Sequence, residues 1–445
     1  MVTGLPLLFI IAGAILFIVV ACSRLHWHPF LALLVTALLT GLFVGLPIKD
    51  IANIANEGFG NMMTHIGLVV ILGTLIGTVL EKTGATLRIA NGIVRLFGKD
   101  KPVLAITIIG AVVGIPIFCD SGFVILNGLA KPLSLESRKS YTAIVSGLAG
   151  GLYITHCFLP PHPGTLAGAA NLGLGQNLGV VILTGLLVSF PTTMICWWFA
   201  SRFLNKPGGL DSFDEVKEEE NKYLPALWKS ILPIVIPVFF IAGGSLTALL
   251  NMPGKMKSIL QFFGNPLLAL LCGLLLSLLL VRKEESTLFK KWMSEAMVHA
   301  GPILILVGAG GVFGNVLKST PLADFVGQWV KAGSFSPIVF LLIAYAIGCL
   351  LKTAQGSTTS AIIIATSILA PIAPVAGFED PFLLSLLLSA TASGAMMVSH
   401  TNDAYFWVIS QFSGLSMQET YRSFSLVSIV LSLSSLLFIL LLALL

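Results

Sequence analysis

The chain has 445 residues, of which 56% are hydrophobic and only 10% are charged, with a formal net charge of +5. This composition excludes a soluble globular protein and predicts a polytopic membrane protein whose surroundings are a lipid bilayer. The basic residues are spread among short segments between apolar runs, so the charge does not predict a nucleic-acid partner.

Apolar runs of about 20 residues, long enough to cross a bilayer, recur along the whole chain. We predict ten spans, two of them interrupted: 4–22, 28–47, 62–81, 140–173 (interrupted), 176–200, 230–250, 265–281, 299–317, 382–413 (interrupted) and 422–445. No charged segment precedes the first run, which we therefore expect to be retained as a helix rather than removed as a signal peptide. Two further stretches, 102–135 and 336–374, carry Pro, Gly and polar residues near their middle, which is typical of re-entrant hairpins.

The distribution of Lys and Arg predicts the orientation. With the N-terminus outside, 19 of the 25 basic residues fall in cytoplasmic loops and five fall outside, while Lys352 stays in the membrane. This asymmetry favours both hairpins. If either stretch crossed the membrane an odd number of times instead of returning to the same side, every loop after it would move to the opposite side of the membrane. The hydrophilic segment 201–229 is interpreted as a cytoplasmic linker between the units 1–200 and 230–445.

The two units share a repeated pattern. Residues 28–34 match residues 265–271 at an offset of 237, and at the same offset Gly73 meets Gly310 and Gly77 meets Gly314. Weaker matches pair Pro102 with Pro337, Asp120 with Gln355, and Thr155-His156 with Ser399-His400. An odd number of crossings separates the matching spans, so we expect two inverted-topology repeats, the pattern of secondary transporters that bind substrate near the midplane.

The first interrupted span contains a sequence that cannot remain helical. Pro160, Pro161 and Pro163 fall within four positions, inside a run of 62 residues, 140–201, without Asp, Glu, Lys or Arg. Proline lacks a backbone N–H and pushes the preceding residue towards extended geometry. Broken backbone at membrane depth is tolerated only where it is buried in protein or lines a cavity, so this break predicts a binding site.

The first hairpin carries an isolated carboxylate. Asp120 follows eighteen uncharged residues and precedes ten more, and Ser121 is its neighbour. A charged group in hydrocarbon costs at least about 2.5 kcal/mol and usually has a function. The alternative is that Asp120 caps the second hairpin helix, and the two roles are compatible.

The second hairpin combines a cation, an amide and hydroxyls. Lys352, Gln355 and the run Ser357, Thr358 and Thr359 surround Gly356. The hydroxyls open a helix whose N-terminal N–H groups favour an anion. Ser and Thr are also ordinary packing residues in membrane helices, so the cluster predicts more than any single member.

Titratable residues gather at the two interrupted spans. The first span supplies Thr155 and the possible proton carriers His156 and His162. The second supplies His400, Thr401, Asn402 and Asp403. A membrane histidine can equally be a hydrogen-bonded packing residue, whereas Asp403 has no other charge nearby in the sequence.

Metal and enzyme chemistry have little support. No metal-binding histidine spacing, Gly-rich nucleotide loop or nucleophile elbow occurs, and we predict no metal or organic cofactor. The six cysteines lie in apolar segments without C-x-x-C spacing and are read as buried hydrophobes.

These motifs resemble the gluconate permease family of proton symporters. The most specific parts are 155–164, Gly-Gly-Val-Phe at 310–313, Gln-Gly-Ser at 355–357 and the run 399–407, and the resemblance extends over nearly the whole chain. It implies an elevator-type transporter with two hairpins and two broken helices, usually a homodimer, in the inner membrane. The hairpin sequences Asp120-Ser121-Gly122 and Gly356-Ser357-Thr358-Thr359 are more polar than the family pattern, which leaves the substrate open.

We therefore expect a symporter that imports gluconate or a related sugar acid with protons. Substrate contacts are assigned to Ser121, Thr155, His156, Lys352, Gln355, Ser357, Thr358, Thr359, Thr401 and Asn402. Proton coupling is assigned to Asp120, Asp403, His156, His162 or His400. Sodium coupling is an alternative, as are D-serine, glycerate or another short hydroxy acid as substrate, a channel, and a membrane-embedded enzyme.

Overall fold

The computed structural model describes residues 1–97, 101–204, 224–247, 254–325, 336–401 and 403–444. Regular structure within these ranges is helical throughout, without a β-strand, as predicted. Eight of the helices are long and apolar enough to cross a membrane, which makes the chain a multi-pass membrane protein. Most of the linker 201–229, namely 205–223, lies outside the described residues, as does Asn402.

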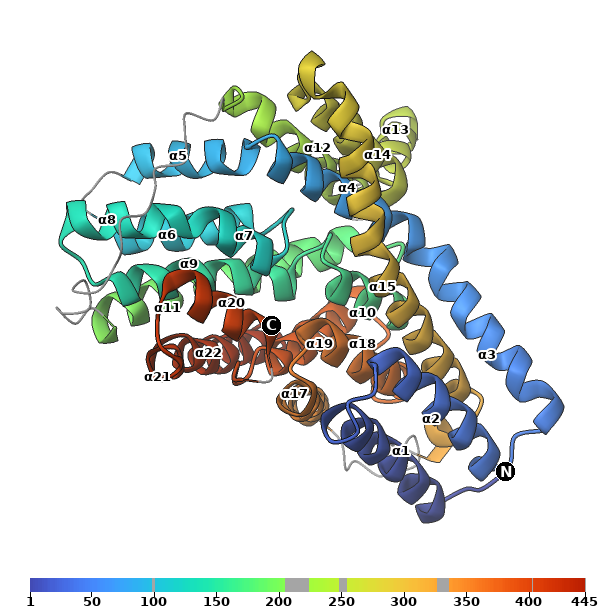
Figure 1. Ribbon diagram of the computed structural model, residues 1–445. Helices are drawn as coiled ribbons and strands as arrows, with labels where there is room; N and C mark the ends of the chain where they lie inside the picture. The colour runs from blue at the N-terminus through green and yellow to red at the C-terminus, as the bar shows by residue number, and fades with distance from the viewer. Residues whose placement is uncertain (98–100, 205–223, 248–253, 326–335, 402, 445) are drawn as a thin grey trace.

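The first unit contains the elements from α1 to α11 (Figure 1). Their bounds are α1 Leu5–Ser23, α2 Pro29–Val44, α3 Ile48–Met62, the π-helix η1 Met63–Gly67, α4 Leu68–Lys82, α5 Ala85–Phe97, α6 Pro102–Val113, α7 Cys119–Leu126, the 3-10 helix η2 Asn127–Leu129, α8 Ala130–Ser137, α9 Tyr141–Phe158, α10 Pro163–Asn171 and α11 Leu178–Phe203. The helices α3 and α4 continue one another through η1, so they form one candidate span, Ile48–Lys82, of 35 residues.

The second unit contains the elements from α12 to α22. Their bounds are α12 Leu227–Leu246, α13 Gly254–Gly264, α14 Pro266–Ser277, η3 Leu278–Leu280, η4 Lys283–Glu285, α15 Ser286–Lys318, α17 Pro337–Gln355, α18 Thr358–Leu369, α19 Pro381–Ala395, α20 Ala404–Ser413, α21 Met417–Thr420, the π-helix η5 Tyr421–Ser425 and α22 Leu426–Leu442. The longest of these is α15, with 33 residues.

The number of spans differs from the ten that the apolar runs predicted. Pro29–Val44 and Pro381–Ala395 have only 16 and 15 residues, which is short against the roughly 20 that a bilayer needs. Conversely, α17, the first arm of the second predicted hairpin, has 19 residues and qualifies as a span by itself. A bent pair, Lys257–Gly264 with Pro266–Leu280, raises the count from eight to nine if it crosses as one span.

Proline fixes where several helices begin. It is the first residue of six of them, at Pro29, Pro102, Pro163, Pro266, Pro337 and Pro381. Its missing N–H costs nothing there, because the first N–H groups of a helix have no intrahelical acceptor. At the matched positions before Pro29 and Pro266, His28 and Asn265 accept hydrogen bonds from the backbone N–H groups of Phe30 and Leu267.

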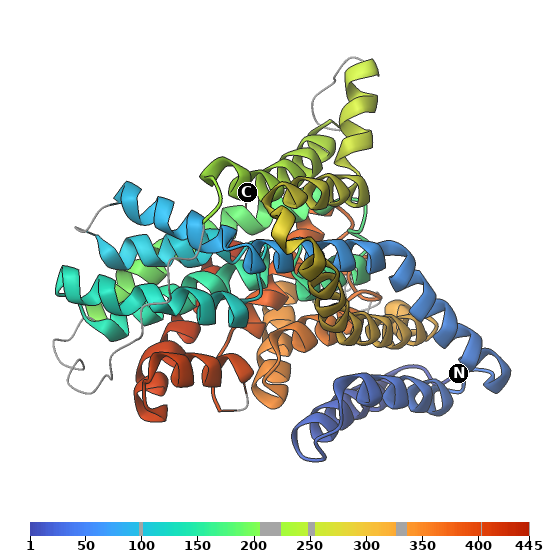
Figure 2. The same ribbon diagram turned by 45° about the horizontal axis from the view of Figure 1, so that its top comes forward.

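Corresponding helices in the two units make corresponding contacts. The helix α6 packs along α9 as α17 packs along α19, and the short helices cross between units, α10 against α18 and α7 against α20 (Figure 1). Helices α1, α2, α3 and α15 form the opposite end of the molecule from α5 to α8, which both views show (Figure 2). The inverted orientation of the units and an elevator motion stay predictions.

Small residues let the helices α4 and α15 approach the two central segments closely. A Cβ on Gly77 of α4 would lie 2.5 Å from the carbonyl oxygen of Pro116, in the turn between α6 and α7. A Cβ on Gly310 of α15 would clash with the side chain of Ile363 on α18. These glycines therefore bring α4 and α15 against the segments that carry the candidate site.

Candidate functional site

The candidate site lies at the centre of the molecule, where two helices are broken and two pairs of helices, α6–α7 and α17–α18, are joined by turns. The helix α9 stops at Phe158 and α10 starts at Pro163, while α19 stops at Ala395 and α20 starts at Ala404. Between α17 and α18 only Gly356 and Ser357 are non-helical. Each break exposes helix ends, which leave backbone groups free to meet side chains or a ligand.

Glycine makes the turn between α17 and α18 possible. Gly356 has φ +76°, the left-handed conformation that glycine adopts without a steric penalty, and its N–H donates to the carbonyl oxygen of Lys352. The chain then reverses into Ser357, whose Oγ accepts the N–H of Ser360 at 3.2 Å and caps α18. This turn places the end of α17 beside the start of α18.

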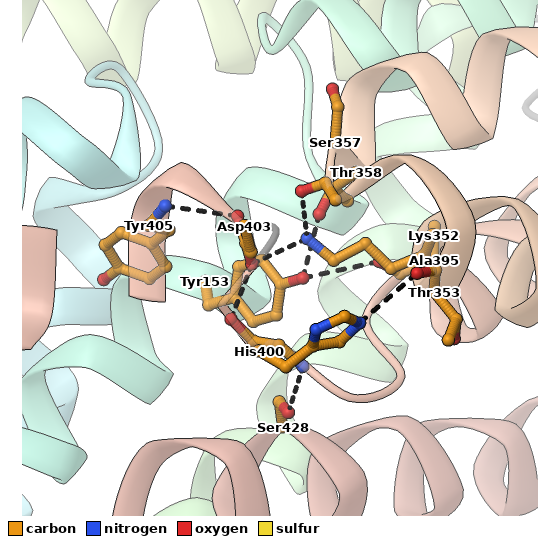
Figure 3. Close-up of polar contacts among 12 residues, drawn as sticks. Tyr153, Lys352, Thr353, Ser357, Thr358, Ala395, His400, Asp403, Tyr405 and Ser428 are labelled. Carbon is orange, nitrogen blue, oxygen red and sulfur yellow. Dashed lines mark hydrogen bonds and ion pairs between the residues drawn. The ribbon is translucent and has the colours of Figure 1, made fainter. Parts of the chain in front are cut away.

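A buried ion pair links this turn to the second broken helix. The Nζ atom of Lys352 lies 2.7 Å from Oδ2 of Asp403, and their side chains are 0% and 7% exposed. Lys352 Nζ also donates to the carbonyl oxygen of Gly356 at 2.8 Å (Figure 3). Since neither charge reaches water, each depends on the other for its stability.

Asp403 is held by two further groups besides the lysine. Its Oδ1 accepts the backbone N–H of Tyr405 at 3.1 Å, which caps α20. The hydroxyl of Ser399 donates to Oδ2 at 2.5 Å. The carboxylate is therefore fully hydrogen-bonded in this conformation, which is the condition for a stable buried charge.

Aromatic side chains cover the ion pair on one side. The Tyr153 hydroxyl lies 2.8 Å from Thr358 Oγ1, and Lys352 Nζ lies 5.8 Å from the centroid of the Tyr153 ring. The rings of Tyr153 and Tyr405 are 5.7 Å apart, and the Tyr405 hydroxyl donates to the carbonyl oxygen of Ala149 at 3.0 Å. A cation over a tyrosine ring gains electrostatic stabilisation when water is excluded.

The first unit brings a second carboxyl group to the same centre. Asp120 lies in the first turn of α7, close enough to Asp403 and Lys352 to interact electrostatically with both. The helix α7 has no side-chain cap, so the capping role considered for Asp120 is not observed. Its Oδ1 is buried without a hydrogen-bond partner.

The two histidines of the first break lie against each other. The ring centroids of His156 and His162 are 4.6 Å apart, and Phe118 lies within 6.4 Å of both rings. His162 Nε2 is 2.5 Å from the carbonyl oxygen of Gly114, which fixes that ring to the end of α6. His156 Nδ1 is buried and has no partner.

Several polar atoms at this centre have no hydrogen bond within the described part of the chain. They are Asp120 Oδ1, His156 Nδ1, and both the oxygen and the nitrogen of the Gln355 side-chain amide. Leaving a buried polar group unpaired costs about 1–3 kcal/mol, and native structures rarely accept that without a reason. Unpaired donors and acceptors therefore come from three segments, and they are of the kind that a ligand with several polar groups would satisfy.

A small pocket lies next to the centre. It has a volume of about 70 Å³ and is lined by Ser121, Phe118 and His162 on one side and by Thr78, Lys82 and Glu295 on α4 and α15 on the other. Lys82 Nζ and Glu295 Oε2 form an ion pair of 2.7 Å at its wall.

The remaining predicted residues lie in different surroundings. Thr155 Oγ1 is bonded back to carbonyl groups of its own helix, and Thr359 packs near Gly164. Thr401 is exposed and bonded to Tyr421, while His400 lies 3.3 Å from the carbonyl oxygen of Thr353. Within the described residues, no group of three or more His, Cys, Asp or Glu side chains could hold a metal ion.

Residues 5–445 match the family described as GntP family permease. The chain belongs to the GntP permease family. It is therefore a membrane transporter rather than an enzyme, as the sequence predicted, and the resemblance to gluconate permeases is confirmed.

Two relatives carry names that differ in substrate. A gluconate permease of Pseudomonas aeruginosa is 29% identical, with 96% of this chain and 95% of the relative covered. A D-serine transporter, DsdX, of Escherichia coli is also 29% identical, with 94% of each chain covered. The chain thus matches relatives of different cargo over almost their full length.

A solved structure shares the fold. The YdaH transporter of Alcanivorax borkumensis has a TM-score of 0.66 and 16% sequence identity, and the match covers 93% of this chain and 98% of that chain. At this identity the likeness concerns architecture alone.

Sequence reasoning missed two residues of this GntP permease site. Tyr153 and Tyr405 form the wall around the ion pair but were not singled out. Tyr153 lies in a segment free of charge and Tyr405 in one whose sole charged residue is Asp403, and in such apolar segments a tyrosine hydroxyl must find a partner. That requirement was the available signal, because buried tyrosines in hydrocarbon mark hydrogen-bonded contacts between segments.

Proposed function

We propose that this permease imports gluconate or a related sugar acid together with protons across the inner membrane. The observation that carries the proposal is the set of unpaired buried polar atoms on Asp120, His156 and Gln355 around the Lys352–Asp403 pair. A polyhydroxylated carboxylate supplies both donors and acceptors for such atoms, which an apolar substrate does not.

The roles follow from the chemistry of each group. The substrate carboxylate binds at Lys352 and the N-terminus of α18, where Ser357 to Thr359 supply hydroxyl and N–H groups. The substrate hydroxyls bind the unpaired oxygen of Asp120, the ring nitrogen of His156 and the amide of Gln355. Asp403 or Asp120 carries the coupling proton, with His156, His162 and His400 as further candidates.

The pocket beside Ser121 and His162 is the route by which the site reaches water. Its lining joins Ser121 and His162 of the central segments to α4 and α15, so we place loading and release here, through a movement of the central segments against these two helices. We assign that movement to an elevator mechanism in a homodimer, as the family resemblance implies. Its driving force is the proton gradient, with sodium as the alternative.

A short hydroxy acid is the second candidate cargo. The D-serine transporter among the relatives favours this alternative, because it covers the chain as fully as the gluconate permease does. Besides the carboxylate, D-serine carries one ammonium and one hydroxyl and glycerate carries two hydroxyls, which is fewer groups than the four atoms that Asp120, His156 and Gln355 leave unpaired. Gluconate therefore accounts for more of the observed polar atoms.

Uptake into proteoliposomes tests the proposal. Labelled gluconate should accumulate under an inward proton gradient, the accumulation should collapse with a protonophore, and excess gluconate should compete better than glycerate or D-serine. Accumulation that needs sodium and ignores the protonophore would contradict proton coupling. Flux without accumulation would indicate a channel, and no uptake of any of the three acids would contradict the proposed substrate class.

A further inference from the structure

We infer that Lys352 exchanges counter-ions during transport: it pairs with Asp403 when the site is empty and with the substrate carboxylate once Asp403 is protonated. This inference rests on the proposed function and assigns the proton to one residue. The starting point is the ion pair itself, whose two side chains are almost completely buried. A buried lysine cannot bind a second carboxylate while its first counter-ion keeps its charge nearby.

The net charge of the site decides which states can move through the membrane. Counting Lys352, Asp403 and the substrate, with Asp120 protonated throughout, an empty site with an ionised Asp403 is neutral, and so is a loaded site with a protonated Asp403. A loaded site with an ionised Asp403 carries an extra negative charge, and an empty site with a protonated Asp403 leaves Lys352 unpaired. Both charged states are expensive in a medium without water, so only the two neutral states cross readily.

This selection produces coupling of one proton to one carboxylate. Outside, a proton binds the carboxylate of Asp403, Lys352 loses its partner, and the substrate anion takes that place. Inside, the proton leaves Asp403, the restored negative charge recaptures Lys352, and the substrate is released. Each cycle therefore moves one anion and one proton, without net charge for a monocarboxylate.

The surroundings of Asp403 fit both protonation states. The Tyr405 N–H donates to Oδ1 whether or not Oδ2 carries a proton, so α20 stays capped. The Ser399 hydroxyl donates to the ionised Oδ2 now and can accept from a protonated Oδ2 after rotation. Protonation therefore removes the lysine without leaving Asp403 or α20 unsatisfied.

The surroundings of Lys352 also suit a substrate carboxylate in place of Asp403. Its bond to the carbonyl oxygen of Gly356 and its position over the Tyr153 ring hold the ammonium at the turn before α18. Ser357 and Thr358 start that helix directly beside it. A carboxylate replacing Asp403 would thus meet an ammonium and a helix N-terminus together.

Other titratable groups face the pair from the packed elements. They are Cys119 and Asp120 on α7, Tyr153, His156 and Cys157 on α9, and Tyr405 on α20. Among the described residues, Asp403 is the carboxylate bonded to Lys352, whereas Asp120 interacts with the lysine only through space. Protonation of Asp403 is therefore the event that frees the lysine.

Substrate binding by purified protein across pH tests the exchange. Gluconate, glycerate and D-serine are titrated between pH 5 and 8. For the carboxylate that wild type binds, affinity should fall as the pH rises, by about tenfold per pH unit where Asp403 is ionised in the empty protein, since one proton is taken up with each anion. Asp403→Asn should bind that acid with no pH dependence and, at pH 8, more tightly than wild type. Lys352→Met should lose measurable binding at every pH.

Asp380 supplies the matched control. It caps α19 through the backbone N–H groups of Phe382 and Leu383, but it is exposed and pairs with no lysine of the described residues. Asp380→Asn should keep the wild-type pH profile. Thermal melting with and without gluconate separates misfolding from lost binding, because Asp403→Asn should gain more stability from the acid than wild type does.

The possible results distinguish failure of the counter-ion exchange from failure of the proposed function. An Asp403→Asn protein that keeps the wild-type pH dependence, or a folded Lys352→Met protein that keeps its affinity, would overturn the counter-ion exchange and leave the proposed function standing. Wild-type protein that binds none of the three acids would contradict the proposed function, and the exchange would fall with it.

Discussion

The hydroxyl of Tyr153 lies 2.8 Å from that of Thr358, although 205 residues separate them in the sequence. This bond joins the first broken helix to the start of α18, where we place the substrate carboxylate. The two units therefore meet at the site through side chains as well as through packed helices.

Replacing Tyr153 with Phe should weaken both stability and transport. The change removes the hydroxyl that Thr358 contacts and should cost about 1 kcal/mol, with a raised KM for gluconate because the α18 N-terminus is less well positioned. Melting temperature and uptake kinetics measure the two effects. Tyr141→Phe is the control, since Tyr141 donates to the carbonyl oxygen of Ser413 at 3.1 Å, and it should lose stability without a change in KM. An unchanged KM in Tyr153→Phe would contradict the placement.

The Lys352–Asp403 pair should show strong coupling in a double-mutant cycle. Lys352→Met or Asp403→Asn alone leaves one buried charge without a partner, and each should cost about 3–5 kcal/mol in the empty protein. The double variant removes both charges and should be more stable than either single variant. Thermal melting without substrate measures this, and additive losses would show that the pair is not energetically coupled.

Replacing Gln355 with Leu should separate binding from folding. Both amide atoms of Gln355 are buried and unpaired, so the variant should be at least as stable as wild type. Transport should nevertheless weaken, with KM for gluconate rising about tenfold, which corresponds to about 1.4 kcal/mol of lost binding.

Asn171 is the comparison, because its side-chain amide is hydrogen-bonded whereas that of Gln355 is not. Its amide donates to Ile363 O, Thr366 Oγ1 and Ser367 Oγ, which ties α10 to α18. Asn171→Leu should therefore lose about 1–3 kcal/mol of stability. If Gln355→Leu loses stability in the same way while its KM stays normal, Gln355 is a structural residue.

A methyl group on Gly77 should disturb the contact between α4 and the turn before α7. Its Cβ would lie 2.5 Å from the carbonyl oxygen of Pro116, and backbone cannot easily move aside, so Gly77→Ala should cost about 1–3 kcal/mol and reduce uptake. Gly67→Ala lies in the same continuous helical segment, where the nearest atom is Met63 Sδ at 3.8 Å. Equal behaviour of the two variants in melting and uptake would contradict the close packing.

The sequence predicted the features that depend on local chemistry. A proline such as Pro163 cannot lie inside a regular helix, so the interruption after α9 is predictable from the prolines alone. The helical fold class and the location in a membrane are also predictable, because both depend on the high content of apolar residues. Among the described residues, eight helices are long and apolar enough to span rather than ten, because an apolar run does not reveal where a helix of 16 residues such as Pro29–Val44 stops.

The partners within the site were beyond sequence reasoning. Asp403 stands isolated among uncharged neighbours in the chain, and its counter-ion Lys352 lies 51 residues earlier. Nothing local predicts that these two side chains meet, nor that both amide atoms of Gln355 stay unpaired. Such relationships arise from the packing of α17, α19 and α20 and require the three-dimensional structure.

The most direct test of this account is a structure determined with gluconate bound at acidic pH. We predict the gluconate carboxylate within hydrogen-bond distance of Lys352 Nζ, its hydroxyls on Asp120, His156 and Gln355, and Asp403 no longer bonded to the lysine. Gluconate bound elsewhere, with the 2.7 Å contact between Lys352 and Asp403 intact, would contradict the proposed site.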